Sequence, residues 1–453
     1  MEGLEVRSAY LQDSSVSRLF DWTNSMRLVQ FLPSVLLIGL VTTVSFAGEH
    51  DWPQWRGPER DGHAAPQPLL SLWPEGGPKL KWSVDTLGLG YSSQAVADSR
   101  VFTMGADQEQ CFVACLDVNS GSTLWRTPIS RASTKDDYLH GWGGGPRSTP
   151  TVDGKNVYAL SDLGTVACLS TEDGSIRWKV DLLEFPDASV PKWGFSESVL
   201  IDGNRAVVTP GGKNLVVALD KNSGEVLWNS EGISEGAQYV SVMQGNFNDV
   251  PFYTTASASG LHIFHAESGE KLFHTPESGN RTAVIPTPII DLPFVYHTSD
   301  YGAGNVLVKL SGRPGTLQAE TVYHLDNKSM QNHHGGVVLV DGVIYGFTKA
   351  DGGQWMAQDL ESGETLWMHK IRGARSGSIS YADGHLYCYN DGDGSLHLVK
   401  PSRQGWEETG RLVLPKQTSF ERGSGAIWAH PIVARQTLLI RDQELLFAYD
   451  IAK

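Results

Sequence analysis

Cysteine is scarce in this chain, with 4 among 453 residues. No two cysteines are adjacent and no Cys-x-x-Cys-His segment occurs, which excludes covalent attachment of a haem. Cys111 and Cys115 are expected on one strand, about 13 Å apart, which is too far for a disulfide. Cys115 and Cys168 occupy equivalent positions of a repeated sequence. We therefore expect the cysteines to be small core residues and not a disulfide framework.

Basic residues are also few relative to acidic ones. The chain has 36 lysines and arginines against 51 aspartates and glutamates, a net charge of −15. Such an acidic chain is not expected to bind nucleic acid or an anionic membrane surface. It also lacks a phosphate-binding loop, a dinucleotide fingerprint and a nucleophile elbow. The sequence therefore carries no common catalytic signature.

What the sequence does contain is a repeated phrase, Asp-x-x-Ser-Gly-x-x-Leu-Trp, with a period near 50 residues. Three strong copies and two weaker ones occur, at 117–125, 220–228, 359–367, 170–178 and 265–273. Their final aromatic residues are Trp125, Trp228, Trp367, Trp178 and Phe273. A period of this length indicates one supersecondary unit used many times.

Each repeat reads as four strands joined by tight turns. The Asp can accept hydrogen bonds from backbone two residues on, and the Gly can adopt φ > 0, so the phrase predicts a turn before a Trp-bearing strand. Alternating apolar residues before the phrase predict a strand. An Asp-Gly pair about 15 residues earlier, as at 341–342, predicts a hairpin. Tandem four-stranded units favour a β-propeller over a sandwich or a β-helix.

Counting the units predicts eight blades. Seven can be placed at 92–125, 148–178, 196–228, 239–273, 286–323, 334–367 and 376–412. An eighth begins at 430 and stops near 450 without its Trp-bearing outer strand. Residues 79–85, which carry Trp82, are a strand of the missing type. We therefore predict an all-β, eight-bladed propeller of four-stranded antiparallel blades, with the ring closed by 79–85 completing the last blade.

The residues before the propeller, which spans 79–453, divide into three segments. Residues 26–47 resemble a signal peptide, with Arg27, an apolar run and small residues before Gly48, so an exported protein of the periplasm or cell envelope is expected. An uncleaved anchor helix is the alternative. Residues 1–25 are unusual ahead of such a signal, and we expect translation to begin at Met26. Residues 48–78 form a lead-in.

The loops that enter the inner strands should meet at one mouth of the channel. Their polar and aromatic residues are the candidate ligand-binding set: His140, Trp142, Arg147, Trp193, Glu197, Tyr239, His333, His334, Arg375, Trp428 and His430. Aromatic walls with a few polar groups suit a flat ligand, an extended peptide or a glycan. The tryptophans could instead pack between blades.

Other features of these residues bear on the chemistry. Arg147 and Arg375 could bind an anion or pair with carboxylates. If His333 and His334 lie in a strand, they point to opposite faces, so at most one of them should face the channel. The scattered histidines have no ligand spacing, so no metal site is predicted. Asp300 could act as a base but has no evident partner.

The phrase resembles the PQQ-like repeat of quinoprotein dehydrogenases and of BamB-type outer-membrane assembly proteins, over 79–453. The segment Trp-Pro-Gln-Trp-Arg-Gly-Pro-Glu-Arg-Asp-Gly at 52–62 resembles the lead-in of exported bacterial PQQ-like propellers, some of them polyvinyl-alcohol-dehydrogenase-like. The resemblance implies an envelope scaffold or binding protein, with an envelope protein, small molecule or glycan as partner. The alternative that it implies is a PQQ-dependent dehydrogenase of alcohols or polyols.

The dehydrogenase alternative implies pyrroloquinoline quinone (PQQ) and Ca²⁺ in the channel, an Asp base, a Trp floor and a disulfide between adjacent cysteines. Asp300 and either Trp193 or Trp428 are the candidates for the base and the floor. The adjacent cysteines are missing, so the scaffold or binding role is the first expectation.

Overall fold

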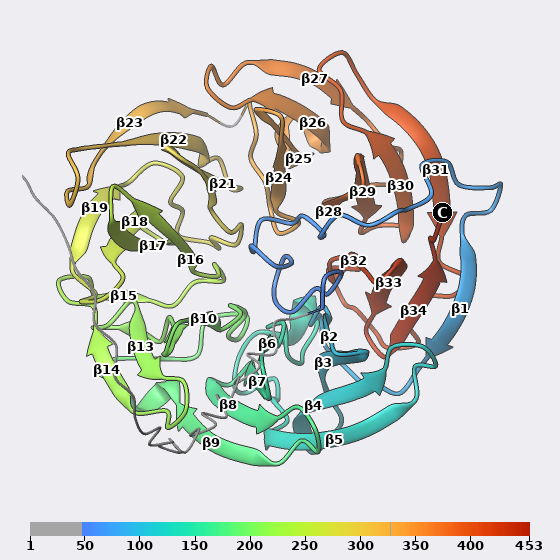
Figure 1. Cartoon of the computed structure of the whole chain (residues 1–453), viewed down its shortest axis with the longest axis horizontal. Coiled ribbons are helices and arrows are strands. Elements are labelled where there is room, and N and C mark those ends of the chain that lie inside the picture. The colour runs from blue at the N-terminus through green and yellow to red at the C-terminus, as the bar shows by residue number, and fades with distance from the viewer. Residues whose placement is uncertain (1–47, 327) are drawn as a thin grey trace, which may run out of the picture. The chain divides into compact units, whose positions relative to one another are not determined.

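Eight four-stranded antiparallel sheets are formed by the described residues, 48–326 and 328–453, of the computed structural model. Figure 1 shows these sheets as blades around a central axis. The predicted all-β, eight-bladed propeller is confirmed. The expectations for residues 1–47, including the signal peptide and the start at Met26, lie outside the described residues. Among the described helices, none is long and apolar enough to cross a membrane.

The first four blades run in chain order. They comprise β2 (Ala95–Ala97), β3 (Arg100–Ala106), β4 (Gln110–Asp117) and β5 (Thr123–Arg131); β6 (Thr151–Asp153), β7 (Asn156–Leu160), β8 (Thr165–Ser170) and β9 (Ile176–Asp181); β10 (Leu200–Asp202), β11 (Arg205–Val208), β13 (Val217–Asp220) and β14 (Val226–Asn229); and β16 (Met243–Phe247), β17 (Val250–Ser257), β18 (Gly260–His265) and β19 (Lys271–Thr275).

The last four blades follow the same pattern. They comprise β20 (Ile289–Asp291), β21 (Phe294–Ser299), β22 (Gly304–Ser311) and β23 (Gln318–Leu325); β24 (Val337–Val340), β25 (Val343–Thr348), β26 (Gln354–Asp359) and β27 (Thr365–His369); β28 (Gly377–Ala382), β29 (His385–Asn390), β30 (Ser395–Lys400) and β31 (Glu407–Val413); and β32 (Ile432–Ala434), β33 (Thr437–Asp442), β34 (Leu445–Asp450) and β1 (Lys79–Val84). A small extra sheet pairs β12 (Gly211–Gly212) with β15 (Glu235–Gly236), and the short 3-10 helices are η1 (His140–Trp142), η2 (Leu182–Glu184) and η3 (Ala350–Gly352).

The repeated phrase forms the turn that its residues predict. The Asp117 carboxylate accepts hydrogen bonds from the backbone N–H groups of Asn119 and Ser120, at 3.0 and 2.9 Å. Gly121 has φ of 72°, which favours glycine. The Asp220 carboxylate accepts the equivalent backbone bonds in the third blade. The turn is therefore encoded locally in each copy.

In the blades whose phrase ends in Trp, this Trp packs on the turn of a neighbouring blade. The Trp125 indole N–H donates to the Thr171 carbonyl of the second blade at 3.1 Å. A Cβ on Gly174 in that blade's turn would lie 2.6 Å from the Trp125 ring, so the ring packs directly on the glycine. Trp178 makes the same bond to Lys221 in the third blade at 2.9 Å. One phrase thus supplies both halves of a blade contact.

Strand β1 is the outer strand of the sheet that also contains β32, β33 and β34. It pairs antiparallel with β34, with Ser83 opposite Phe447. The Trp82 indole N–H donates to the Val118 carbonyl of the first blade at 3.0 Å, and Gly121 packs on its ring. Strands from both ends of the propeller segment therefore share one sheet.

Apolar side chains fill the spaces between neighbouring blades. Phe102 and Val113 of the first blade share a buried cluster with Val157 and Ala167 of the second. The cysteines at 111, 115, 168 and 388 are all buried and free. Their expected place in the core is confirmed. Figure 1 also shows the blue lead-in crossing the middle of the ring before it reaches β1.

Candidate functional site

A cavity of about 400 Å³ lies where the loops entering the inner strands converge. Eight of the eleven predicted ligand-binding residues line it: Trp142, Arg147, Trp193, Tyr239, His333, His334, Trp428 and His430. The other lining residues are Trp55, Tyr91, Lys192, Ser196, Thr282, Ala283, Ile285 and Tyr301. The loops therefore meet at the channel as the repeat pattern predicts, and their roles as ligand contacts stay a prediction.

The wall of the cavity is built from aromatic rings. Trp142 and Trp428 stack with centroids 6.1 Å apart and planes 25° apart. Tyr91 packs against Trp428 at 5.3 Å, and its hydroxyl donates to the Trp142 carbonyl at 2.9 Å. Trp142 is 42% exposed, unusual for an indole. The blade-packing alternative does not describe Trp142, because this side chain faces the open cavity.

Arg147 is held in the cavity by neutral groups. Its guanidinium donates to the carbonyls of Gly143 and Gly145, at 2.7 and 3.0 Å. It also lies over the rings of Tyr91 and Tyr138, at 5.4 and 5.6 Å from their centroids. Within the described residues, Arg147 forms no ion pair with a carboxylate. The guanidinium is therefore held in one orientation, and no carboxylate among these residues neutralises its charge.

The lining is positively charged in an acidic protein. The second cation is Lys192, whose ammonium lies 4.7 Å from the Trp193 ring centroid. The described lining residues include no aspartate or glutamate. Arg147 is partly buried and Lys192 is exposed, so both cations favour an anion, and water screens the attraction by Arg147 less.

Three histidines contribute uncharged polar groups to the lining. The Nδ1 atoms of His333 and His334 are 3.1 Å apart, and His430 Nε2 lies 3.2 Å from the His334 carbonyl. Burial lowers the pKa of His333 to about 4 and that of His430 to about 3, and places the pKa of His334 well below its usual value. These imidazoles are therefore neutral at pH 7.

Both His333 and His334 line the cavity, so the expectation made for a pair in a strand does not apply to them. The alternation of side chains holds only within a strand, and the pair lies in the loop before β24. Here a loop presents two adjacent side chains to one space.

Three candidate residues and the proposed base do not line the cavity. His140 packs on the Tyr138 ring at 4.4 Å, and exposed Arg375 donates its backbone N–H to Asp391. Glu197 is buried, accepts a hydrogen bond from the Thr209 N–H, and has its pKa raised to about 7 by burial. Asp300 is 9% exposed, and burial raises its pKa.

Sequence reasoning missed three aromatic lining residues, Tyr91, Trp55 and Tyr301. Tyr301 lies in the turn between β21 and β22 and not in a loop that enters an inner strand. Tyr91 lies in the loop 90–93, one of the loops expected at the mouth of the channel. Its position in that loop could therefore have predicted it as a lining residue. Trp55 lies in the lead-in, outside the repeats, so no equivalent position in other blades could point to it. Its place in the cavity follows only from the folded lead-in.

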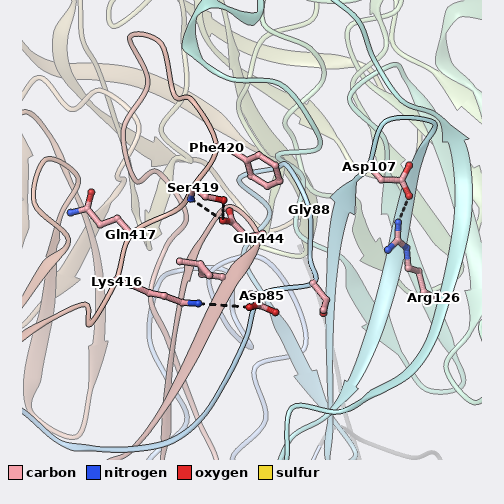
Figure 2. Close-up of a pocket in the computed structure, with 11 residues that line it drawn as sticks. Asp85, Gly88, Asp107, Arg126, Lys416, Gln417, Ser419, Phe420 and Glu444 are labelled. Atoms are coloured by element: carbon pink, nitrogen blue, oxygen red, sulfur yellow. Dashed lines mark hydrogen bonds and ion pairs between the residues drawn. The ribbon is translucent and has the colours of Figure 1, made fainter.

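A second hollow of similar size, about 410 Å³, lies at the seam between the eighth and first blades (Figure 2). Its two cations are already paired, Lys416 with Asp85 at 3.7 Å and Arg126 with Asp107. The Glu444 carboxylate accepts hydrogen bonds from the Ser419 backbone N–H and hydroxyl. Both of its cations are thus already paired, and Glu444 adds a third carboxylate, so this hollow suits an anionic ligand less well than the central cavity does.

The residues lining the central cavity do not fit Ca²⁺. This ion takes roughly six to eight oxygen ligands, mostly carboxylates and carbonyls. The described lining offers hydroxyls, imidazoles and two cations but no carboxylate. No cluster of three or more histidine, cysteine, aspartate or glutamate side chains suited to a metal ion occurs within 48–326 and 328–453.

Comparison with known proteins places this architecture in a family. A family model described as outer membrane protein assembly factor BamB matches residues 109–368, more than half of the chain. The outer membrane protein assembly factor BamB of Kangiella koreensis is 28% identical over 234 residues, which are 49% of this chain and 52% of that protein. The chain thus spans about half the length of this curated relative.

Solved structures show the same fold at low identity. BamB from Moraxella catarrhalis superposes with a TM-score of 0.53 and 16% identity, covering 80% of this chain and 94% of that one. Quinohemoprotein alcohol dehydrogenase ADHIIG from Pseudomonas putida HK5 gives 0.65 and 12%, covering 89% and 80%. At these identities the likeness shows the fold alone. The match over residues 109–368 shows that the chain belongs to the BamB family of PQQ-like propellers.

Proposed function

We propose that this chain is an exported, non-catalytic binding propeller of the cell envelope, whose central cavity takes a planar, negatively charged ligand. One observation carries the proposal: the lining combines stacked aromatic rings with two cations and no carboxylate. Each of these features selects for a different property of the ligand, the rings for flatness and the cations for charge.

The rings and the cations can act on one molecule at once. A planar ligand would lie against the exposed Trp142 and its neighbour Trp428, gaining the stacking energy of aromatic pairs. Arg147 carries more N–H donors than the two glycine carbonyls accept, so a carboxylate or phosphate can take the rest. Because Arg147 is already oriented, binding costs little side-chain entropy.

The place in the envelope is proposed from the family and the N-terminal sequence. Membership in the BamB family supports a scaffold role beside an envelope protein. Residues 26–47 support export, since they have the pattern of a signal peptide. The loop face around the cavity is the part of the chain proposed to meet a partner.

The dehydrogenase alternative draws support from the quinohemoprotein structures, which share the fold. The rings and Arg147 suit the flat, acidic ring system of a quinone. The lining offers no oxygen set for Ca²⁺, and Asp300 does not line the cavity, so the base is not in place. We therefore place binding ahead of oxidation.

A matched pair of probes tests the proposal. 2-Naphthoate and 2-naphthamide share a ring system and differ in charge, and calorimetry with the mature protein should show the acid binding at least tenfold more tightly. Arg147→Gln should weaken naphthoate binding by about tenfold, the value of a charge-assisted hydrogen bond. Arg313→Gln, at an exposed position between β22 and β23, is the matched control and should bind naphthoate normally.

Two outcomes would contradict the proposal. Equal binding of both probes, or binding of neither, would show that the cavity does not select a planar anion. Binding of PQQ that requires Ca²⁺, with dye reduction on an alcohol panel, would instead establish the dehydrogenase.

A further inference from the structure

The lead-in residues 51–64, here called the hub segment, contact the inner strands of several blades. Trp52 exchanges backbone hydrogen bonds with Val96 of the first blade, at 3.0 and 2.7 Å. The Pro53 carbonyl accepts from the Val152 N–H of the second blade at 2.8 Å. Gly62 and Ala64 bond to the backbone of Tyr381 in the seventh blade, both at 2.8 Å. The segment therefore runs within the channel.

Two buried arginines fasten the hub segment to two more blades. Arg60 is 2% exposed and donates to the carbonyls of Ser198 and Val199, at 2.8 and 3.3 Å, where the third blade begins. Arg56 is 4% exposed and donates to the Val337 carbonyl of the sixth blade. Both arginines have left-handed φ, 59° for Arg56 and 60° for Arg60. Such strain persists where surrounding contacts impose it.

The channel is shaped around the Arg56 side chain. A Cβ on Gly336 would lie 2.3 Å from its Nη1 atom, and a Cβ on Gly62 would lie 2.7 Å from its Nη2 atom. Both glycines have positive φ, at 68° and 92°. The blade and the hub segment therefore leave room for the guanidinium by omitting side chains on two sides.

Trp55 is the hub residue that lines the ligand cavity. Its indole N–H donates to the Thr287 hydroxyl, in the loop entering the fifth blade, at 2.9 Å. Its ring meets the His430 ring edge to face, with centroids 4.6 Å apart. Trp55 is thus held from the fifth and eighth blades, and its neighbour Arg56 is held from the sixth.

We infer that the hub segment plugs the channel and that Trp55 is the ligand-contacting floor of the cavity, which sets the length of ligand accepted. The role of Trp55 rests on the proposed function, while the plug stands on the contacts above. A floor supplied by the plug makes the cavity blind. The ligand is therefore a compact planar anion that enters from the loop face, and not an extended peptide or glycan threading the ring.

A change of probe length tests Trp55. Biphenyl-4-carboxylate is longer than 2-naphthoate and has the same charge, so wild-type protein should prefer naphthoate. Trp55→Ala should remove the floor and shift the affinity ratio at least tenfold towards the biphenyl probe. Trp55→Phe, which keeps a ring, should retain most of the wild-type preference. A ratio that Trp55→Ala leaves unchanged would overturn the assignment, because general loss of structure weakens both probes alike.

Hydrogen exchange tests the plug without any ligand. Backbone amides of 52–64 should exchange as slowly as those of the inner strands, and Arg60→Gln should speed them at least tenfold, while Arg313→Gln should not. Fast exchange of 52–64 in wild-type protein would overturn the plug. Slow exchange with no binding of either carboxylate would retain the plug and reject the proposed function together with the role of Trp55.

Discussion

At the scale of a residue, the buried Glu197 carboxyl carries an electrostatic cost, because burial disfavours its charged form. It is 1% exposed, and burial raises its pKa to about 7, against hydrogen bonds from Thr209 and the charge of Arg60, which lower it. A raised pKa means that the folded state prefers the protonated acid. The stabilisation that the protonated Glu197 carboxyl gives to the folded state is therefore complete below the unfolded pKa of 4.5. It is lost as the pH rises through the folded pKa of about 7.

Replacing this carboxyl with an amide should remove that pH dependence. Between pH 5 and pH 8, Glu197→Gln should gain roughly 3 kcal/mol in unfolding free energy relative to wild type, from the size of the pKa shift. Urea unfolding at the two pH values measures the difference. Glu231→Gln, at an exposed position, is the control and should follow the wild-type profile. Parallel profiles for Glu197→Gln and wild type would show that the carboxyl titrates normally.

At the scale of an element, the contact between neighbouring blades can be tested at Trp125, whose indole bonds to Thr171 and whose ring covers Gly174. Trp125→Phe keeps the ring and loses the N–H, so it should cost about 1 kcal/mol of stability. Trp125→Ala should cost about 3 kcal/mol, since it also removes the ring from a packed contact. Leu124→Ala, at a 49% exposed position on the same strand, should cost little. Denaturant midpoints would decide, and an equal loss for Phe and Ala would contradict the docking role.

The elements that sequence could predict are those whose signal is local and repeated. The turn at Asp117 and Gly121 needs only its own residues, so the blade count followed from finding its copies. In the fifth blade the phrase is degenerate, and the structure has the Tyr323 hydroxyl donating to the Leu360 carbonyl at 2.7 Å instead. No sequence pattern predicts that Tyr323 makes this contact in place of a Trp.

The residues that line the cavity were likewise predictable only in part. Loops of equivalent position predicted most of its lining, whereas Trp55 arrives from outside the repeats and depends on the fold of the hub segment. Strand alternation would place only one of His333 and His334 on the cavity, but this pair lies in a loop, where alternation does not apply. His140 and Arg375 lie in the expected loops but not on the cavity, because loop position does not fix where a side chain points.

At the scale of the whole molecule, one sheet of the ring combines strands from two distant parts of the chain. β1 supplies the outer strand of the eighth sheet, and Trp82 from this strand contacts the first blade at Val118 and Gly121. In every other blade the strands keep the chain order, although β12 of the small extra sheet intervenes in the third blade. Closure of the ring by 79–85 is therefore a prediction about cooperativity, because β1 pairs with the last blade and its Trp82 docks on the first.

Replacing residues 79–85 with a glycine–serine segment of equal length tests closure while keeping the connection to β2. The change exposes the edge of β34 and uncovers Gly121, so hydrogen exchange should rise in β32–β34 and in β2–β5 before it rises elsewhere. The apparent melting temperature should fall by more than it does for Trp125→Ala, since strand pairing is lost as well as one ring. Leu80→Ala, at a 39% exposed position of the same strand, should leave both readouts near wild type. Unchanged melting after the replacement would mean that the eight blades hold together without this strand, because the remaining blade contacts and the hub segment would then suffice to keep the ring shut.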